Sequence, residues 1–262
     1  MRDEGQARRV TAEVLCGRLD ASLRAGAEGA LASDGDGTLW HGDVGDALFD
    51  RLVDEGLLRD AARGALAREA TAAGLAEDFD ANQLARGLRE AYRAGRLDEG
   101  RYFALQAWST AGFTEDELRE LCVEVLEAFG FEDAVRPSMR RVLEWSRARA
   151  ISFYLVSASP RPMLLEVARR LELDPARVVA MEPVVREGRV WPELASVPTY
   201  GPGKVQRLAS LLGDAPLLAA FGDSAWDAAM LERAAYPVMV APRPALCAEL
   251  AGFDGIFVLE EA

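Results

Sequence analysis

The stretch "LASDGDGTLW" (31–40) places two aspartates, Asp34 and Asp36, on either side of one glycine at the end of a short apolar run. Two like charges at this separation repel each other, and a carboxylate at the end of a buried strand loses part of its hydration. A bound cation would offset both costs. Aspartate and glycine are also common turn residues, so the stretch by itself is compatible with either a cation site or a surface turn.

The length and charge of the chain set the scale of the fold and the class of ligand. The chain has 262 residues, 50% of them hydrophobic, which is enough for one large α/β domain with an insertion. Its net charge of −13 predicts no nucleic-acid partner, because a duplex needs a basic face to release its counterions. An anionic small molecule is also repelled at long range, so a phosphate site must supply its own positive charge.

The cysteines and the first residues bear on where the protein is found. Cys16, Cys122 and Cys247 are odd in number and far apart, which argues against a disulfide framework and against a zinc cluster. The opening "MRDEGQARRV" lacks the apolar segment of a secretory signal, and no run of about 18 apolar residues predicts a transmembrane helix. We therefore expect a cytoplasmic protein without a membrane partner.

Strands and helices alternate through the second half of the chain. Apolar runs rich in β-branched and aromatic residues predict strands, and amphipathic segments between them predict helices. The expected strands are 29–33, 151–159, 176–182, 216–224, 236–241 and 256–259, with a hairpin around Glu187 and Gly188 and an N-terminal helix over 6–26. This order predicts a Rossmann-like three-layer α/β fold, a parallel sheet with helices on both faces.

A long helical block interrupts this pattern after the first strand. Between Asp43 and Glu127 the apolar residues recur at helical spacing, and Thr114 followed by Glu117 predicts a capping box. We expect an α-helical cap domain over 46–131 and a core domain made of 1–45 and 132–262. Such an insertion would lie above the carboxyl ends of the strands, where open α/β sheets bind ligands.

Polar residues follow the core strands at the point where each strand ends. Each one has an ordinary explanation, because serine caps helices and a lysine in a first helical turn is usually solvated. Their recurrence at the carboxyl ends of successive parallel strands instead indicates one shared site. The residues concerned are Asp34, Asp36, Ser157, Lys204, Asp223 and Asp227.

Four short motifs at these strand ends resemble a known family. In order, "DGDGTL", "VSAS", "GPGK" and "GDSAWD" are similar to the four signature motifs of the haloacid dehalogenase (HAD) superfamily of phosphatases and phosphotransferases. The resemblance covers 29–45 and 135–258, and the stretch "VSASPRPMLLEVARRLEL" looks most like the branch that includes phosphoserine phosphatase. It implies a HAD-like core with a helical cap, and a Mg²⁺-dependent phosphatase that hydrolyses a small-molecule phosphate monoester.

The resemblance also implies a role for each acidic residue. Asp34 would be the nucleophile that forms an aspartyl-phosphate, and it would bind Mg²⁺ together with Asp223 and the backbone carbonyl of Asp36. The side chain of Asp36 would protonate the leaving oxygen and then activate water. Asp227 would orient Lys204 or a metal-bound water.

The remaining motif residues would bind the phosphate. Ser157 would donate a hydrogen bond to a phosphate oxygen, and Lys204 would hold both the nucleophile and the phosphate as a point charge. The presence of Asp36 argues against a dehalogenase, because a leaving halide needs no proton. A phosphotransferase or phosphomutase of the same fold, and a non-catalytic phosphate-binding regulatory module, stay open as alternatives.

The expected substrate-binding residues are Asp43, Ser159, Trp40 and Gln106. Asp43 stands nine residues after Asp34, where phosphoserine phosphatases place the acid that binds the substrate ammonium, although it is also a good helix N-cap. Gln106 falls near the position of that family's carboxylate-binding arginine, and the arginine nearby, Arg101, is not aligned with it. This difference argues against L-phosphoserine as the substrate.

The aromatic residues near the site leave the substrate class open. Trp40, Tyr102, Phe103 and Trp108 either line a pocket for a bulky or cationic group, which would make the substrate amino-containing, or pack in the interior of the cap. His41, the only histidine, either contacts substrate or is an ordinary exposed side chain.

Overall fold

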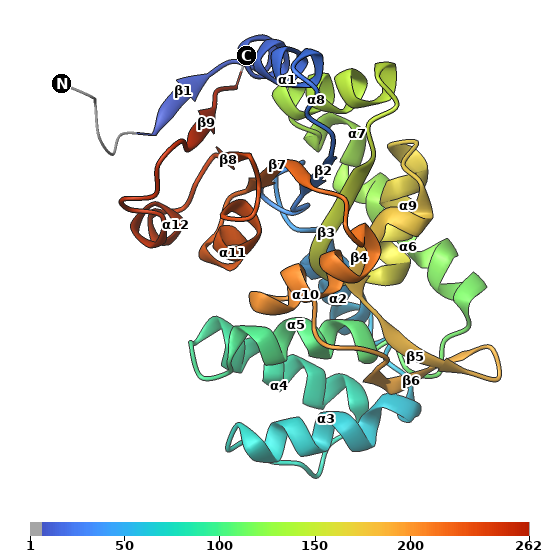
Figure 1. The fold of residues 1–262 in the computed structure, drawn as a ribbon. Helices are drawn as coiled ribbons and strands as arrows, with labels where there is room; N and C mark the ends of the chain where they lie inside the picture. The colour runs from blue at the N-terminus through green and yellow to red at the C-terminus, as the bar shows by residue number, and fades with distance from the viewer. Residues whose placement is uncertain (1–6, 262) are drawn as a thin grey trace.

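The computed structural model describes residues 7–261 and has a parallel β-sheet at its centre (Figure 1). All six strand pairings of the sheet are parallel, and the strand order is β1-β9-β8-β7-β2-β3-β4. The strands are β1 (Arg8–Val10), β2 (Ala30–Ser33), β3 (Phe153–Pro160), β4 (Val178–Met181), β7 (Leu217–Gly222), β8 (Tyr236–Val240) and β9 (Phe257–Leu259). The predicted Rossmann-like α/β fold is confirmed.

The central strands are buried on both faces. Every residue of β2, β4 and β7 is buried, as expected where helices cover both sides of a parallel sheet. Neighbouring side chains of a strand point to opposite faces, so Leu31 joins one apolar cluster and Ala32 the other. Small side chains such as Ala219 and Ala220 let the helices approach the middle of the sheet closely.

Two layers of helices cover the sheet. One face packs against α1 (Ala12–Arg24), α8 (Pro137–Ala148) and α9 (Arg161–Arg170). The other face packs against α10 (Pro202–Leu212), α11 (Ala228–Leu231) and α12 (Pro244–Glu249). These two apolar clusters hold the strand ends in fixed positions, which a preorganised site requires.

Between β2 and α8 the regular elements of the chain are all helices. They are α2 (Val44–Asp54), α3 (Asp60–Ala72), α4 (Ala81–Arg93), α5 (Glu99–Trp108), α6 (Glu115–Phe129) and α7 (Phe131–Ala134). The capping box that begins α6 at Thr114 is present as predicted. The hairpin of β5 (Pro183–Arg186) and β6 (Arg189–Leu194) packs on α3 and α5, while α2 and α5 contact β3. Figure 1 shows α3, α4 and α5 below the sheet. The boundaries of 46 and 131 for a separate cap domain stay a prediction.

The structure corrects the sequence prediction at both ends of the chain. The predicted helix over 6–26 is a strand at Arg8–Val10 followed by α1, while residue 6 lies outside the described residues. Thr11 separates the two elements, because its hydroxyl accepts a hydrogen bond from the backbone N–H of Val14 and caps α1. The predicted helix after β7 begins as a short 3₁₀ turn, Ala225–Asp227, and α12 was not predicted.

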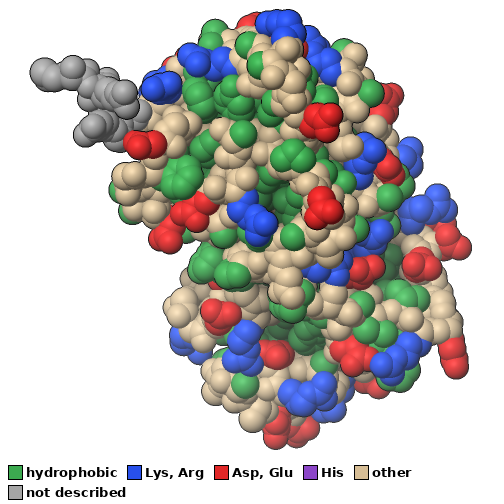
Figure 2. Space-filling view, viewed as in Figure 1, with side chains coloured by type: hydrophobic (Ala, Val, Ile, Leu, Met, Phe, Trp, Pro, Cys, Tyr) green, Lys and Arg blue, Asp and Glu red, His purple; other side chains and the backbone are tan. Residues whose placement is uncertain are grey.

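Figure 2 shows acidic and basic side chains interspersed over the visible face. Among the helices of residues 7–261, none combines the length and the apolar character needed to span a bilayer.

Candidate active site

A cavity of about 50 Å³ lies where the carboxyl ends of β2, β3 and β7 meet. Five of the six residues expected at the strand ends line it, namely Asp34, Asp36, Ser157, Lys204 and Asp223. Glu99 and Phe103 of α5 close its opposite side. The sheet therefore gathers ionisable groups from distant segments around one cavity, with residues of the helical insertion on its opposite side.

Asp34 and Lys204 form a buried ion pair at the floor of this cavity. The Nζ atom of Lys204 lies 2.6 Å from Oδ1 of Asp34, and the hydroxyl of Thr38 donates a hydrogen bond to the other carboxylate oxygen at 3.0 Å. Burial raises the pKa of Asp34 well above its usual value, against the lowering effect of Lys204. Burial alone would lower the pKa of Lys204, but Asp227 and Asp34 raise it more strongly. Lys204 is the only lysine among 30 basic side chains.

Asp227 lies behind Lys204 and fixes its position. Its Oδ1 accepts a hydrogen bond from Nζ of Lys204 at 2.6 Å, while its Oδ2 accepts from the backbone N–H groups of Asp223 and Ser224. The chain can turn this closely only because residue 222 is glycine, since a Cβ atom there would lie 2.4 Å from Cβ of Asp227. Both oxygens of Asp227 are therefore used within the protein, which suits a residue that positions the lysine.

Asp36 accepts four hydrogen bonds from its surroundings. Its Oδ1 accepts from the indole Nε1–H of Trp40 at 2.9 Å and from the backbone N–H of Val44 at 2.7 Å. Its Oδ2 accepts from the hydroxyls of Ser159 at 2.6 Å and Ser157 at 3.1 Å. The carboxyl group is thus held in one orientation, with Oδ2 directed at the two serines of β3.

The structure corrects the expected role of Trp40. Its side chain is fully buried, packs edge-to-face on Phe131 with ring centroids 5.4 Å apart, and does not line the cavity. The ring fills the space beside Gly35, where a Cβ atom would lie 2.4 Å from it. Trp40 therefore holds Asp36 from behind and contributes no surface for substrate.

Gln106 is also placed differently from the prediction. It is buried outside the cavity lining, and its Nε2 donates a hydrogen bond to Oδ1 of Asp46 at 2.6 Å. Tyr102 and Trp108 pack in the interior of the insertion, the second of the two alternatives for them. His41 is exposed, with Nε2 3.4 Å from the guanidinium of Arg136.

Asp43, Ser159 and Phe103 do line the cavity, as expected of residues that could contact substrate. Asp43 also caps α2, because its Oδ1 accepts a hydrogen bond from the backbone N–H of Asp46 at 2.7 Å. Burial raises the pKa of Asp43 well above its usual value, and Asp36 and Asp46 raise it further. Asp43 therefore caps α2 and also faces the cavity, and its contact with substrate stays a prediction.

The acidic groups at the floor fit a hard divalent cation. Carboxylate oxygens of Asp34, Asp223 and Asp227 lie within 4.8 Å of one another. Residue 37 is glycine at φ +79°, and a Cβ atom there would lie 2.5 Å from Oδ2 of Asp223. Burial raises the pKa of Asp223, as expected for a carboxylate gathered with like charges. An all-oxygen donor set of this kind suits Mg²⁺, with Asp227 already engaged by the lysine.

Several residues of the cavity were not predicted from the sequence. Arg243 follows β8, and its Nε donates a hydrogen bond to Oδ2 of Asp223 at 2.8 Å. The rule that found the other strand-end residues would have found it too. Trp226 stands between Asp223 and Asp227 in the motif after β7, so the strand-end rule could have found it as well. Glu99 begins α5 and Tyr200 lies in the loop before α10, and neither periodicity nor a strand end points to them.

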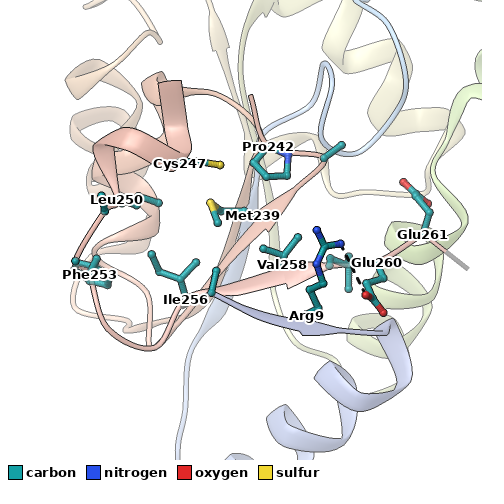
Figure 3. Close-up of a pocket in the computed structure, with 15 residues that line it drawn as sticks. Arg9, Met239, Pro242, Cys247, Leu250, Phe253, Ile256, Val258, Glu260 and Glu261 are labelled. Atoms are coloured by element: carbon teal, nitrogen blue, oxygen red, sulfur yellow. Dashed lines mark ion pairs between the residues drawn. The ribbon is translucent and has the colours of Figure 1, made fainter. Parts of the chain in front are cut away.

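A larger cavity of about 990 Å³ lies toward one edge of the sheet, beside β8, β9 and α12 (Figure 3). Its wall includes apolar side chains such as Met239, Leu250 and Ile256, and its charged groups stand at one end. It collects no cluster of buried carboxylates, so the strand-end cavity is the candidate for chemistry within the described residues.

The chain is similar to one family and to several solved structures. A family model described as haloacid dehalogenase-like hydrolase matches residues 31–232. A crystal structure of a protein of unknown function from Bordetella pertussis Tohama I is 22% identical, with a TM-score of 0.69, and the match covers 88% of this chain and 97% of that one. Comparison with curated proteins gives no match.

Two further structures are more distant in sequence. A HAD family hydrolase from Salmonella enterica subsp. enterica serovar Typhi is 17% identical with a TM-score of 0.57, covering 94% of this chain and 79% of its own. A substrate-bound phosphoserine phosphatase is 14% identical with a TM-score of 0.52, covering 90% of this chain and 94% of its own. At these identities the similarity is one of fold.

Proposed function

This chain belongs to the haloacid dehalogenase-like hydrolase family, and from this premise we propose that it is a Mg²⁺-dependent phosphatase acting on a small-molecule phosphate monoester. One observation carries the proposal. The carboxylates of Asp34 and Asp36 line one cavity, the first bonded to a buried lysine and the second to two serine hydroxyls. A nucleophile, a source of positive charge and a proton carrier therefore stand together, as phosphoryl transfer requires.

In the first step a carboxylate oxygen of Asp34 attacks phosphorus and forms an acyl-phosphate bond, while the bond from phosphorus to the ester oxygen breaks. Asp36 gives its proton to the leaving oxygen, so the alcohol departs neutral. Lys204 offsets negative charge on the nucleophile and the phosphate, and Asp227 holds the lysine in place.

In the second step Asp36 takes a proton from a water molecule, which attacks phosphorus and releases inorganic phosphate from Asp34. The hydroxyl of Ser157 would turn from Asp36 to a phosphate oxygen when substrate is present. Asp34, Asp223 and the backbone carbonyl of Asp36 would hold Mg²⁺. When bound, the ion supplies positive charge to the phosphate oxygens and reduces the repulsion among the carboxylates.

The size of the cavity adds a conformational requirement. A volume of about 50 Å³ is far below the roughly 300–1,000 Å³ of usual ligand pockets, so we infer that a phosphate ester enters only after a change of conformation. The helical insertion would have to move away from the core to admit an ester and then close to exclude water.

We keep the cytoplasm as the proposed location. Within the described residues all three cysteines are free, and Cys122 is buried, which suits a reducing compartment. The proposed partner is the small phosphate ester alone.

The test is hydrolysis of p-nitrophenyl phosphate with Mg²⁺ and with a chelator. We expect activity only with the metal, and a loss of about 10³-fold or more in Asp34→Asn, because the amide cannot form the acyl-phosphate. Asp116→Asn, an exposed acid far from the site, is the matched control. Measuring inorganic phosphate against phosphate transferred to an added alcohol separates a hydrolase from a transferase. Full activity in Asp34→Asn would refute the proposed nucleophile.

A further inference from the structure

We propose that Arg136 is a positioning residue for the catalytic loop, which we define as residues 34–38, and that it fixes the backbone of this loop at Gly37. The proposal rests on the proposed phosphatase function and names a residue outside the cavity on which the binding of Mg²⁺ depends. Arg136 does not line the cavity. It acts through the carbonyl group of Gly37, to which its guanidinium donates hydrogen bonds.

Gly37 stands between the two parts of the catalytic loop that carry proposed metal ligands. The peptide group before it contains the carbonyl of Asp36, and the residue after it, Thr38, donates a hydrogen bond to the carboxylate of Asp34 at 3.0 Å. Position 37 has no room for a side chain, because a Cβ atom would lie 2.5 Å from Oδ2 of Asp223. Since glycine rotates more freely than any other residue, this position needs an outside contact to keep one conformation.

Arg136 supplies that contact. Its Nε and Nη2 atoms both donate to the carbonyl oxygen of Gly37, at 3.2 and 2.9 Å. The backbone N–H of Gly37 donates to the carbonyl of Gly42 at 3.1 Å, so hydrogen bonds hold the chain on both sides of the Gly37 Cα atom. Two N–H groups of one planar guanidinium restrict the carbonyl more than a single donor does. The distance between the proposed metal ligands on either side of Gly37 is therefore fixed.

The side chain of Arg136 is itself held in place. It is 7% exposed, and its Nη1 donates a hydrogen bond to Oε1 of Glu261 at 2.6 Å. The hydroxyl of Ser138 donates to Oε2 of the same acid at 3.2 Å. The backbone N–H of Arg136 donates to the carbonyl of Leu39 at 3.1 Å, one residue beyond the catalytic loop. Arg136 is therefore a fixed support, as a preorganised site requires.

A simpler explanation is that Arg136 only ties Glu261 to the core. Such a tie depends on the ion pair, and its loss would lower the melting temperature without changing the affinity for Mg²⁺. Positioning depends instead on the two hydrogen bonds to Gly37. Variants that remove one set of contacts and keep the other therefore separate the two explanations.

The experiment measures Mg²⁺ binding by isothermal titration calorimetry, with the metal alone and no substrate. In Arg136→Lys the ammonium keeps a charge beside Glu261 but cannot also place two N–H groups on Gly37. We expect Mg²⁺ to bind about tenfold more weakly or worse, because loss of a residue that orients metal ligands typically costs about 10–100-fold in affinity. Glu261→Gln removes the ion pair and leaves both bonds to Gly37, so it should bind Mg²⁺ as wild type does.

Two further variants complete the design. Arg136→Met removes both sets of contacts and should weaken Mg²⁺ binding at least as much as Arg136→Lys. Arg141→Met, on the same helix, breaks an exposed pair with Glu13 and should leave Mg²⁺ binding unchanged. If Arg136→Met does not fold, the comparison of Arg136→Lys with Glu261→Gln still decides. Unchanged Mg²⁺ affinity in Arg136→Lys, or an equal loss in Glu261→Gln, would overturn the proposal.

Hydrolysis of p-nitrophenyl phosphate gives a second measurement. Arg136→Lys should need about tenfold more Mg²⁺ for half-maximal activity, while its KM for the ester at saturating Mg²⁺ stays close to that of wild type. A higher KM with an unchanged Mg²⁺ requirement would contradict positioning of the metal ligands.

The wild-type protein separates this proposal from the proposed function. If it binds Mg²⁺ and hydrolyses p-nitrophenyl phosphate, and Arg136→Lys binds the metal equally well, the role of Arg136 fails and the phosphatase stands. If the wild type neither binds Mg²⁺ nor hydrolyses the ester, the phosphatase proposal fails and the role of Arg136 fails with it.

Discussion

Replacing Lys204 by methionine should destabilise the protein strongly. The side chain is 5% exposed, and its Nζ lies 2.6 Å from a carboxylate oxygen of Asp34 and of Asp227. Methionine fills a similar volume but leaves both acids buried without a cation. Breaking such a pair costs about 3–5 kcal/mol, which for a chain of this size lowers the melting temperature by roughly 6–20 °C.

The loss of stability in Lys204→Met should depend on pH in a definite direction. The pKa of Asp34 is already raised by burial, and loss of Lys204 removes the main influence that lowers it. When the pKa of a carboxyl group is higher in the folded than in the unfolded state, the protein has its full stability at a pH below the unfolded-state pKa. That stability is lost as the pH rises through the folded-state pKa. The variant should therefore approach wild type near pH 4 and fall furthest behind above neutrality.

The assay is thermal unfolding followed by circular dichroism in the presence of a chelator, between about pH 4 and pH 8. Adding Asp227→Asn to the variant should recover part of the lost stability, because one buried charge is removed. Arg93→Met, which breaks an exposed pair with Asp50, is the control and should cost less than about 1 kcal/mol. A Lys204→Met protein that melts within about 2 °C of wild type near pH 7.5 would refute the buried ion-pair reasoning.

Four other substitutions test separate parts of the site. Asp223→Asn should raise the melting temperature of the metal-free protein, because the pKa of this buried acid is raised, and should abolish the further rise on adding Mg²⁺ in differential scanning fluorimetry. Gly37→Ala, at φ +79° with a Cβ atom 2.5 Å from Oδ2 of Asp223, should cost about 1–2 kcal/mol and raise the Mg²⁺ concentration needed for half-maximal activity; an unchanged Mg²⁺ titration would contradict the close approach. Arg243→Ala should weaken inhibition by inorganic phosphate about tenfold, because it removes a guanidinium that lines the cavity and would donate to the phosphate as well as to Asp223; competition against p-nitrophenyl phosphate measures this. Trp40→Phe should keep the fold but lower kcat severalfold, because Asp36 loses the donor that orients it; a change in KM alone would contradict this role.

The sheet could be predicted because its strands are buried on both faces. Runs such as 217–222 are apolar at every position, and this pattern marks a central parallel strand without any knowledge of its neighbours. The edge strand Arg8–Val10 has three residues, two of them exposed, and it exists because it pairs with Phe257–Leu259 at the far end of the chain. No local pattern carries that information.

Some residues of the candidate site could be predicted from the sequence and others could not. The residues at strand ends could be found because parallel strands bring their carboxyl ends to one edge. The sequence does not show whether an aromatic side chain next to a motif faces a ligand or the core. In the structure the Trp40 ring packs against Phe131 in the core. Glu99, Tyr200 and Trp226 meet only after the insertion packs on the core, so their association is a tertiary property.

That the sole lysine is also the buried one gives the protein a built-in spectroscopic reporter. Growth with ¹⁵N-labelled lysine would place a single side-chain nitrogen label in the whole molecule, at the Nζ atom between Asp34 and Asp227. One NMR signal would then follow ionisation, ion binding and turnover at the catalytic centre, free of overlap and without any mutation.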